Sequence, residues 1–234
     1  MNSNRGINVR EPTEYKFIFI ADKAWWRRLG KTLKYSLYVC THPLDGFWDL
    51  TNEKRGSVAA ANVIVAASVL VEIFRLTLTN FQFIIINMEY FSSLIVFMRI
   101  LLPVFLWTLA NWSLTTLMDG KGTMKDIYMA VSYALVPSVL INIFLIILSR
   151  IITFDEGSFY YFLSWLSVLW TGVLFICGMM MIHDYSMGKT LFSCLLTIIG
   201  MGVIVFIFVV FFSLISDSIA YFVSIYKELV FRFM

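Results

Sequence analysis

Residues 190–212, with the sequence TLFSCLLTIIGMGVIVFIFVVFF, contain no charged side chain. An α-helix rises ~1.5 Å per residue and the hydrocarbon core of a bilayer is ~30 Å thick, so roughly 20 apolar residues cross it. The apolar character is continuous and does not alternate, which favours a helix over a barrel strand. The stretch is therefore predicted to be a transmembrane helix.

Four further apolar stretches of the same kind precede it in the chain. They are residues 57–76, 91–117, 127–148 and 159–182. The chain is 60% hydrophobic and only 14% charged, which leaves too little polar surface to cover a soluble globule of this size. The predicted fold class is all-α, a polytopic membrane bundle of five transmembrane helices.

The chain is expected to have three parts. Residues 1–56 form a cytosolic interfacial helical segment, residues 57–216 form the five-helix membrane domain, and residues 217–234 form a tail. Apolar residues of the tail recur on one helical face, so the tail either lies along the outer surface or extends the fifth helix.

Positively charged residues are concentrated on one alternating set of the polar breaks. Thirteen Lys and Arg residues lie within residues 1–57, 118–126 and 183–189, against four in the opposite breaks and the tail. Loops rich in Lys and Arg resist translocation. The N-terminus is therefore predicted to be cytosolic and, after five crossings, the C-terminus outside.

The N-terminal segment mixes cations with large aromatic rings but is too short to fold around a core of its own. Rings at headgroup level with Lys and Arg facing anionic lipid are typical of an interfacial helix. A docking site for a protein partner would use the same residues, so both interpretations stay open. The residues concerned are Trp25, Trp26, Arg27, Arg28, Lys31 and Lys34.

Residues 42–50, HPLDGFWDL, connect this segment to the first span. Pro43 is expected to end the preceding helix, and Asp45-Gly46 to allow a chain reversal. The sequence therefore predicts a turn here.

Three polar side chains, Glu72, Arg99 and Asn142, are predicted to share one depth in the outer half of the bilayer. Glu72 lies about 22 Å above the inner boundary and Arg99 about 12 Å below the outer one. An unpaired charge there costs roughly 2.5–3.5 kcal/mol on insertion scales, so we expect Glu72 to pair with Arg99, with Asn142 as hydrogen-bond partner. The cluster is either a structural clamp between the first three spans or the lining of a cavity for a polar or anionic substrate.

Two cytosolic turns complete the candidate contact surface, Asp119-Gly120-Lys121-Gly122 and His183-Asp184. The first is not a phosphate-binding loop, since that loop requires Gly-Lys-Ser/Thr and follows a strand. No paired carboxylates, nucleophile with a base or metal ligands converge at one predicted depth. We therefore expect no enzymatic activity, catalytic residue, cofactor or metal, and no nucleic-acid partner.

The two hairpins that contain these turns are similar to each other at an offset of 63 residues. Leu106-Trp107-Thr108 aligns with Leu169-Trp170-Thr171, and Thr123 and Ser186 are both placed to cap the returning helix. The similarity reflects either an internal duplication or chance matches between apolar helices.

The block from Asn111-Trp112-Ser113-Leu114 through Gly120-Lys121-Gly122 to Tyr133-Ala134-Leu135-Val136-Pro137, with the five-span topology, resembles the Yip1-domain family. The hairpin at residues 183–189 is also similar, and the resemblance covers about residues 40–215. Eukaryotic members act in Golgi and endoplasmic-reticulum trafficking with Rab GTPases and partner Yip proteins. The Asp-Leu-Tyr-Gly-Pro-type motif of those members is absent here, so the chain is more similar to the bacterial branch. That branch implies a plasma-membrane location and no agreed activity or catalytic residue.

Two functions remain open. The first is a non-enzymatic membrane adaptor that holds anionic lipid headgroups, a membrane-protein partner or a second copy of the chain at the cytosolic face. The alternative is a component of a transport system or a lipid-handling protein, with substrate at Glu72, Arg99 and Asn142. The odd number of spans and the absence of two matched broken helices argue against a free-standing alternating-access carrier.

Overall fold

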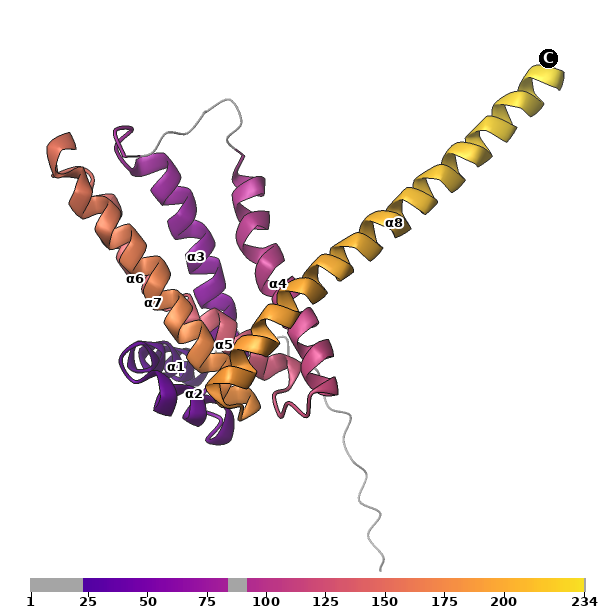
Figure 1. Cartoon of the computed structure of the whole chain (residues 1–234). Coiled ribbons are helices and arrows are strands. Elements are labelled where there is room, and N and C mark those ends of the chain that lie inside the picture. The colour runs from indigo at the N-terminus through magenta and orange to yellow at the C-terminus, as the bar shows by residue number, and fades with distance from the viewer. Residues whose placement is uncertain (1–22, 84–91, 234) are drawn as a thin grey trace, which may run out of the picture.

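The computed structural model describes residues 23–83 and 92–233, which form an all-helical chain (Figure 1). The elements are α1 (Lys23–Thr41), α2 (Pro43–Asn52), α3 (Val58–Leu78), α4 (Ser93–Leu117), α5 (Met124–Ala134), α6 (Val136–Leu148), the short 3₁₀ helix η2 (Phe154–Glu156), α7 (Gly157–His183) and α8 (Met187–Phe233). Residues 1–22 of the predicted N-terminal segment lie outside the described residues.

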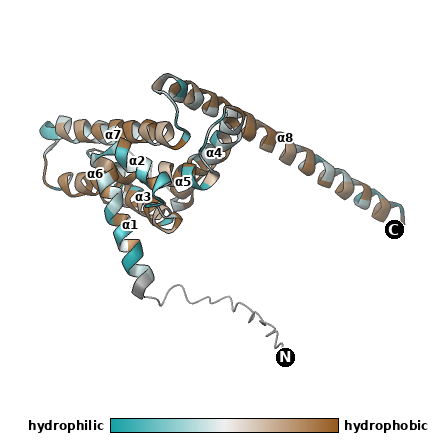
Figure 2. Cartoon of the chain, turned by 90° about the horizontal axis from the view of Figure 1, so that it is seen from below, coloured by the Kyte–Doolittle hydropathy of each residue, from teal (hydrophilic) through white to brown (hydrophobic). Residues whose placement is uncertain are grey.

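Five helical stretches of the described residues are long and apolar enough to cross a membrane. They are α3, α4, the consecutive pair α5 and α6, α7, and α8. Figure 2 shows that apolar residues dominate along these helices, whereas α1 and α2 are more polar. The predicted fold class, an all-α polytopic membrane bundle, is confirmed.

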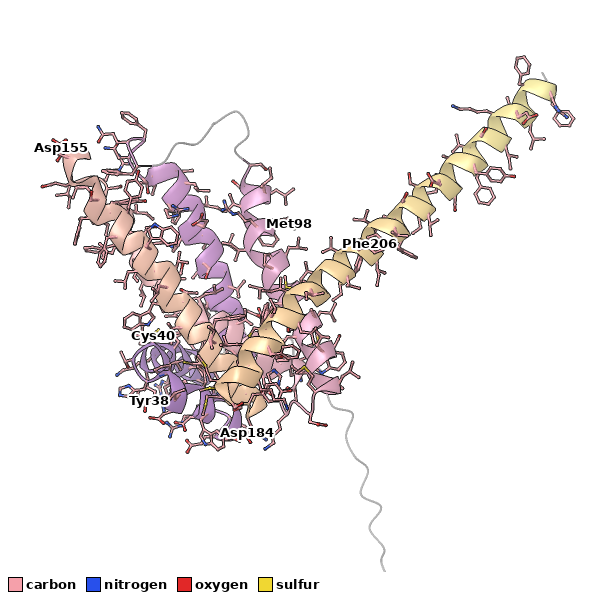
Figure 3. All side chains as sticks on the ribbon, viewed as in Figure 1. Tyr38, Cys40, Met98, Asp155, Asp184 and Phe206 are labelled. Atoms are coloured by element: carbon pink, nitrogen blue, oxygen red, sulfur yellow. The ribbon has the colours of Figure 1, made fainter. Side chains whose placement is uncertain are left out.

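The fifth span differs most from its predicted bounds, because α8 is a single helix of 47 residues. Residues 217–233 continue it without a break, which is the second of the two arrangements expected for the tail. Beyond its first turns α8 leaves the bundle, and its C-terminal half extends away from the other helices (Figure 1). Every residue from Val205 to Phe233 is exposed, and Phe206 lies on the part of α8 that has left the bundle (Figure 3).

The two ends of the bundle are built differently. The end that contains α1, α2 and the turns at residues 118–123 and 184–186 is called the turn end here; the opposite end, with residues 79–83 and 149–156, is called the loop end. The main core lies toward the turn end, where Phe47 of α2 and Ile127 and Tyr133 of α5 are completely buried. A smaller cluster at the loop end contains Phe83, Leu145 and Tyr160.

The prediction that Pro43 ends the preceding helix is confirmed, since α1 ends at Thr41. The predicted turn is wrong, because residues 43–50 form the first part of α2. Pro43 occupies the first turn of this helix, where its missing N–H would have no intrahelical partner in any case. A Cβ on Gly46 would come within 2.9 Å of the Val39 Cα atom, so the glycine permits α2 to pack closely on α1. Phe47 and Leu50 are buried on the inner face of α2. Burial of this apolar face outweighs the local turn signal.

α1 also packs on the bundle and does not stand apart from it. Leu29 and Val39 are buried on its inner face, and the indole Nε1 of Trp170 on α7 donates to the carbonyl oxygen of Cys40 at 3.3 Å. The N-terminal segment therefore shares the core of the membrane domain, which compensates for its lack of a core of its own.

The third span is interrupted where α5 ends at Ala134 and α6 begins at Val136. Pro137 lies in the first turn of α6 and cannot donate to the carbonyl four residues earlier. The expected cap at Thr123 is confirmed: a reciprocal capping box joins the Thr123 and Asp126 side chains to each other's backbone N–H groups. The cap fixes the point at which α5 leaves the first turn.

Candidate functional site

A basic cavity of about 530 Å³ lies at the turn end, between α1 and the chain that leads into α3. One wall comes from α1 and the other from residues 54–59. Four cations and two aromatic rings are among the lining residues, which are Trp25, Arg28, Leu29, Lys31, Thr32, Tyr35, Lys54, Arg55, Gly56, Ser57 and Ala59. Its size is that of a small-molecule or headgroup site.

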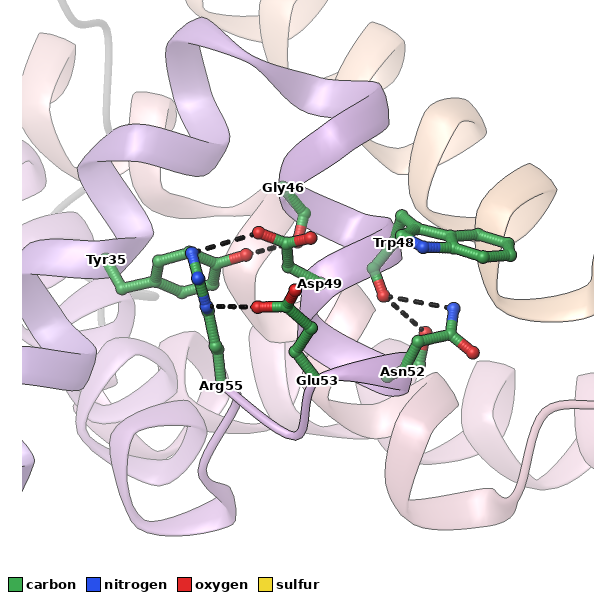
Figure 4. A network of polar contacts seen from close by, with 8 residues as sticks. Tyr35, Gly46, Trp48, Asp49, Asn52, Glu53 and Arg55 are labelled. Atoms are coloured by element: carbon green, nitrogen blue, oxygen red, sulfur yellow. Dashed lines mark hydrogen bonds and ion pairs between the residues drawn. The ribbon is translucent and has the colours of Figure 1, made fainter.

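A network of charged and aromatic side chains fixes one wall of this cavity (Figure 4). Arg55 Nη1 lies 3.0 Å from Asp49 Oδ2, and Arg55 Nε lies 2.7 Å from Glu53 Oε2. The same guanidinium stands 6.0 Å from the centre of the Tyr35 ring. The Tyr35 hydroxyl donates to the Gly46 carbonyl oxygen at 2.6 Å, which joins α1 to α2.

This network leaves the cavity positively charged. Two carboxylates, Asp49 and Glu53, both pair with Arg55, and the lining contains two further cations, Lys31 and Lys54. Burial, together with the nearby Asp49 carboxylate, raises the pKa of the Tyr35 phenol well above its usual range. Tyr35 therefore stays neutral and adds no negative charge to the site.

The predicted N-terminal residues divide between this cavity and the surface. Trp25, Arg28 and Lys31 line the cavity, while Trp26 and Arg27 are exposed outside it. Lys34 lies on the other flank of α1, where it borders an apolar cavity of about 320 Å³ between α1, α3 and α6. The sequence interpretation missed Tyr35, Lys54 and Arg55. The adjacent cations Lys54 and Arg55, directly before the first span, are a signal that could have found part of this wall.

The two turns predicted as contact surfaces are locked to each other. Lys121 Nζ and Asp184 Oδ2 lie 2.7 Å apart in an exposed ion pair that joins the turns. The Tyr185 hydroxyl and Lys189 Nζ both donate to the Met118 carbonyl oxygen, at 2.9 and 3.0 Å. Lys189 Nζ also stands 4.1 Å from the centre of the Tyr185 ring.

Beneath these turns lies a buried polar chain that the sequence interpretation did not predict. His183 Nε2 and Asn111 Oδ1 are 2.9 Å apart, and Asn111 Nδ2 donates to Thr197 Oγ1 at 3.0 Å. All three residues are at most 2% exposed. His183 therefore links α7 to α4 and α8 and is not available to a partner. Contacts across 86 residues, as between Asn111 and Thr197, leave no local sequence signal.

The first turn covers the imidazole closely, which explains its two glycines. A Cβ on Gly120 would lie 2.8 Å from His183 Nδ1, and a Cβ on Gly122 would overlap the Ile182 side chain. Asp119 has a positive φ of 58° and Asp184 one of 56°. Both are Asp residues, which enter this region more readily than most other residues.

The intramembrane cluster is brought together, but its predicted pairing is wrong. Glu72, Arg99 and Asn142 line one cavity of about 200 Å³ between α3, α4 and α6. Glu72 nevertheless pairs with Arg75, through contacts of 2.7 and 2.8 Å. The Asn142 amide donates to Ser138 Oγ at 3.1 Å. Residues three apart on one helix meet without any long-range packing requirement, so Arg75 takes the carboxylate that was expected to bind Arg99.

No group of three or more His, Cys, Asp or Glu side chains in the described part of the chain is arranged to hold a metal ion. Cys40, Cys177 and Cys194 are free and partly buried.

Five spanning helices around a buried polar chain, with a basic cavity at one end, define a polytopic α-helical membrane protein. The sequence model of the Yip1 domain matches residues 37–226, most of the chain. The protein therefore belongs to the Yip1-domain family, and the resemblance inferred from its turns and spans is confirmed. Neither the curated proteins nor the solved structures contained a match.

Proposed function

We propose that this integral membrane protein of the Yip1 family is a non-enzymatic adaptor that holds anionic lipid headgroups at the cytosolic face and thereby organises lipid or a membrane-protein partner. The observation that carries the proposal is the basic aromatic cavity of about 530 Å³ at the turn end. Lys and Arg at headgroup level attract anionic lipid by about 1 kcal/mol each. Indole and phenol rings prefer the same depth.

The charge distribution supports the orientation in this proposal. Cations are concentrated on the same end as the cavity, including the exposed Lys121 of the first turn and Lys125 at the start of α5. By the positive-inside rule the turn end faces the cytosol, in the bacterial plasma membrane that the family resemblance implies. The C-terminal end of α8 is then on the outer side.

The test compares lipid retention by charge variants of the full-length protein. Purified protein in a maltoside detergent is mixed with phosphatidylglycerol or phosphatidylcholine, and bound lipids are counted by native mass spectrometry. Lys31→Gln combined with Lys54→Gln removes two cations of the cavity, and we expect at least a tenfold loss of phosphatidylglycerol affinity. The control is Lys227→Gln, which removes a cation from the far end of α8.

The lipid measurements can either support or contradict the adaptor function. Retention of phosphatidylglycerol over phosphatidylcholine that is lost only in the double variant supports the adaptor function. Equal retention of both lipids by the unchanged protein, or an equal loss in Lys227→Gln, contradicts it. Charge variants are preferable to removal of residues 1–39, because that deletion also removes Leu29 and Val39 from the core.

A second candidate function, a component of a transport system, is favoured by one observation. Glu72, Arg99 and Asn142 line a single cavity inside the membrane domain, and intramembrane ionisable residues commonly mark substrate pathways. This function predicts that a double change of Glu72→Gln and Arg99→Gln abolishes activity in cells while Lys31→Gln with Lys54→Gln preserves it. The adaptor function predicts the reverse.

A further inference from the structure

We propose that the cavity between α3, α4 and α6, toward the loop end, is a binding site for an anionic phosphate group with Arg99 as its anchor. The site is distinct from the basic cavity at the turn end and does not depend on it. It is a binding proposal, and it stands whether or not the chain takes part in transport.

The cavity combines one cation with short polar side chains from three helices. α3 contributes Ser68 and Glu72, α4 contributes Arg99, and α6 contributes Ser138 and Asn142. Arg99 lies six positions after Ser93, about 9 Å along α4 from its first residue. This depth is within reach of the headgroup region for a side chain as long as arginine.

The charges around the cavity do not balance. Glu72 is held by Arg75 in a bidentate pair whose members are 17% and 23% exposed. Among the described residues no carboxylate forms a salt bridge with Arg99. Glu72 compensates the charge of Arg75, and the charge of Arg99 is left without a carboxylate partner among the described residues. Arg99 is exposed at the side of the bundle, where an unpaired cation within reach of the headgroup region favours a bound anion.

The polar lining suits an anion with several acceptor oxygens. A guanidinium presents its N–H donors in a planar fork that matches phosphate oxygens. The Ser138 hydroxyl accepts from Asn142, so its own proton is available to a further acceptor. Serine and arginine donors on facing helices can thus bind the same anion.

The size of the cavity narrows the ligand class. Its volume of about 200 Å³ is below the ~300–1,000 Å³ typical of sites for larger organic molecules. It accommodates a single phosphate group. That group belongs either to a phospholipid of the surrounding leaflet or to free inorganic phosphate, and the experiment separates these sources.

The experiment uses the full-length protein in a phosphate-free maltoside detergent. Inorganic phosphate is titrated by calorimetry, and phosphatidylglycerol is titrated by native mass spectrometry. We expect Arg99→Gln to lower the affinity of the responding ligand at least tenfold, and Arg99→Lys to restore it in part because the charge returns without the fork. Glu72→Gln releases Arg75 from its partner and is expected to raise the affinity severalfold.

The matched control is Arg150→Gln, which removes a cation near the same end of the bundle but outside the cavity. It should leave the affinity unchanged. Phosphatidylglycerol is titrated in a Lys31→Gln/Lys54→Gln background, so that lipid bound in the basic cavity at the turn end does not enter the measurement. Saturation by phosphate alone identifies a free-anion site, and a response only to phosphatidylglycerol identifies a lipid site. Absence of binding by either ligand, or unchanged binding in Arg99→Gln with an unaltered thermal unfolding curve, overturns the proposal.

Discussion

The turn end and the loop end of the bundle differ in whether their polar side chains are buried and paired. At the turn end, Asn111 is buried and hydrogen-bonded to both His183 and Thr197, and His183 Nδ1 is the atom of the three side chains without a partner among the described residues. These three residues are called the closed set here. Toward the loop end, Glu72 and Arg75 satisfy each other and Arg99 is left over beside an open cavity. Buried polar side chains that hydrogen-bond to one another make a membrane bundle more rigid. A charged side chain without a partner, beside an open cavity, can instead bind a ligand. The comparison separates a structural role from a binding role among residues that look alike in the sequence.

The largest loss of stability is expected when a side chain is added next to His183 of the closed set. Gly122→Ala places a Cβ against Ile182 and within 2.9 Å of His183 Cε1, so it should lower the free energy of unfolding by about 3 kcal/mol, as overpacking does. The measurement is unfolding by dodecyl sulfate in mixed micelles, followed by circular dichroism. Gly172→Ala is the control, because a Cβ there meets nothing within 4 Å. If Gly122→Ala lowered the free energy of unfolding by no more than the control does, the turn end would not be tightly packed.

The two asparagines test the comparison directly. Asn111→Ala breaks bonds to His183 and Thr197 and leaves buried partners unsatisfied, so we expect a loss of about 2 kcal/mol. Asn142→Ala breaks one bond to Ser138 within α6, in a partly buried position, and we expect a loss of about 0.5 kcal/mol, as for side-chain pairs four apart on one helix. The same unfolding assay measures both. Equal losses would remove the distinction between closed and open sets.

The pH dependence of stability reports on packing at the turn end. Burial raises the pKa of the Cys40 thiol from 9.0 to about 11, so the folded chain keeps a proton that the unfolded chain loses. The resulting stability is complete below pH 9 and is lost as the pH rises through 11. For a partly buried thiol we expect a loss of about 1 to 2 kcal/mol over this range. Unfolding curves at pH 8 and pH 11 measure it, and Cys40→Ala should show a smaller decline. If the stability of Cys40→Ala declined equally over this pH range, the thiol would be in contact with solvent in the folded protein.

The smallest effects on stability distinguish the exposed Lys121–Asp184 ion pair from the more buried Glu72–Arg75 pair. The Lys121–Asp184 pair is exposed, with side chains 73% and 55% accessible, so Lys121→Gln should cost less than about 0.5 kcal/mol. At 1 M salt, where the Debye length is about 3 Å, this difference should vanish. Glu72→Gln affects the more buried pair with Arg75, and its effect on unfolding should persist at high salt. Unfolding curves of both variants at low and high salt test this. If Lys121→Gln lowered stability equally at both salt concentrations, the assignment of this pair to the surface would be wrong.

What the sequence predicted correctly depends on local patterns. The length of the apolar stretches predicts the spans, and Thr123 forms the expected cap. Each of these signals is contained within one helix or one turn. The predicted depth of Glu72, Arg99 and Asn142 also brought three residues of one cavity together, because helical rise is uniform.

What the sequence did not predict depends on packing between helices. Pro43 and Gly46 are turn formers in isolation, but α2 is stabilised by the burial of Phe47 against distant helices. Glu72 had two possible partners, and hydropathy does not choose between Arg75 and Arg99. The link from Asn111 to His183 and Thr197 joins three helices, so no periodicity within one helix could reveal it.

The length of α8 has a mechanical consequence. A helix of 47 residues is about 70 Å long, more than twice the ~30 Å hydrocarbon thickness of a bilayer. A Cβ on Gly200 would touch Leu114 of α4, and from Val205 onward every residue is exposed. The remaining residues act as a lever of about 43 Å with its pivot near Ile204, where α8 leaves the other helices. A rotation of about 5° at the pivot moves the far tip by about 4 Å at this helical length, so small repacking near Asn111 and Thr197 becomes a large displacement on the other side of the membrane.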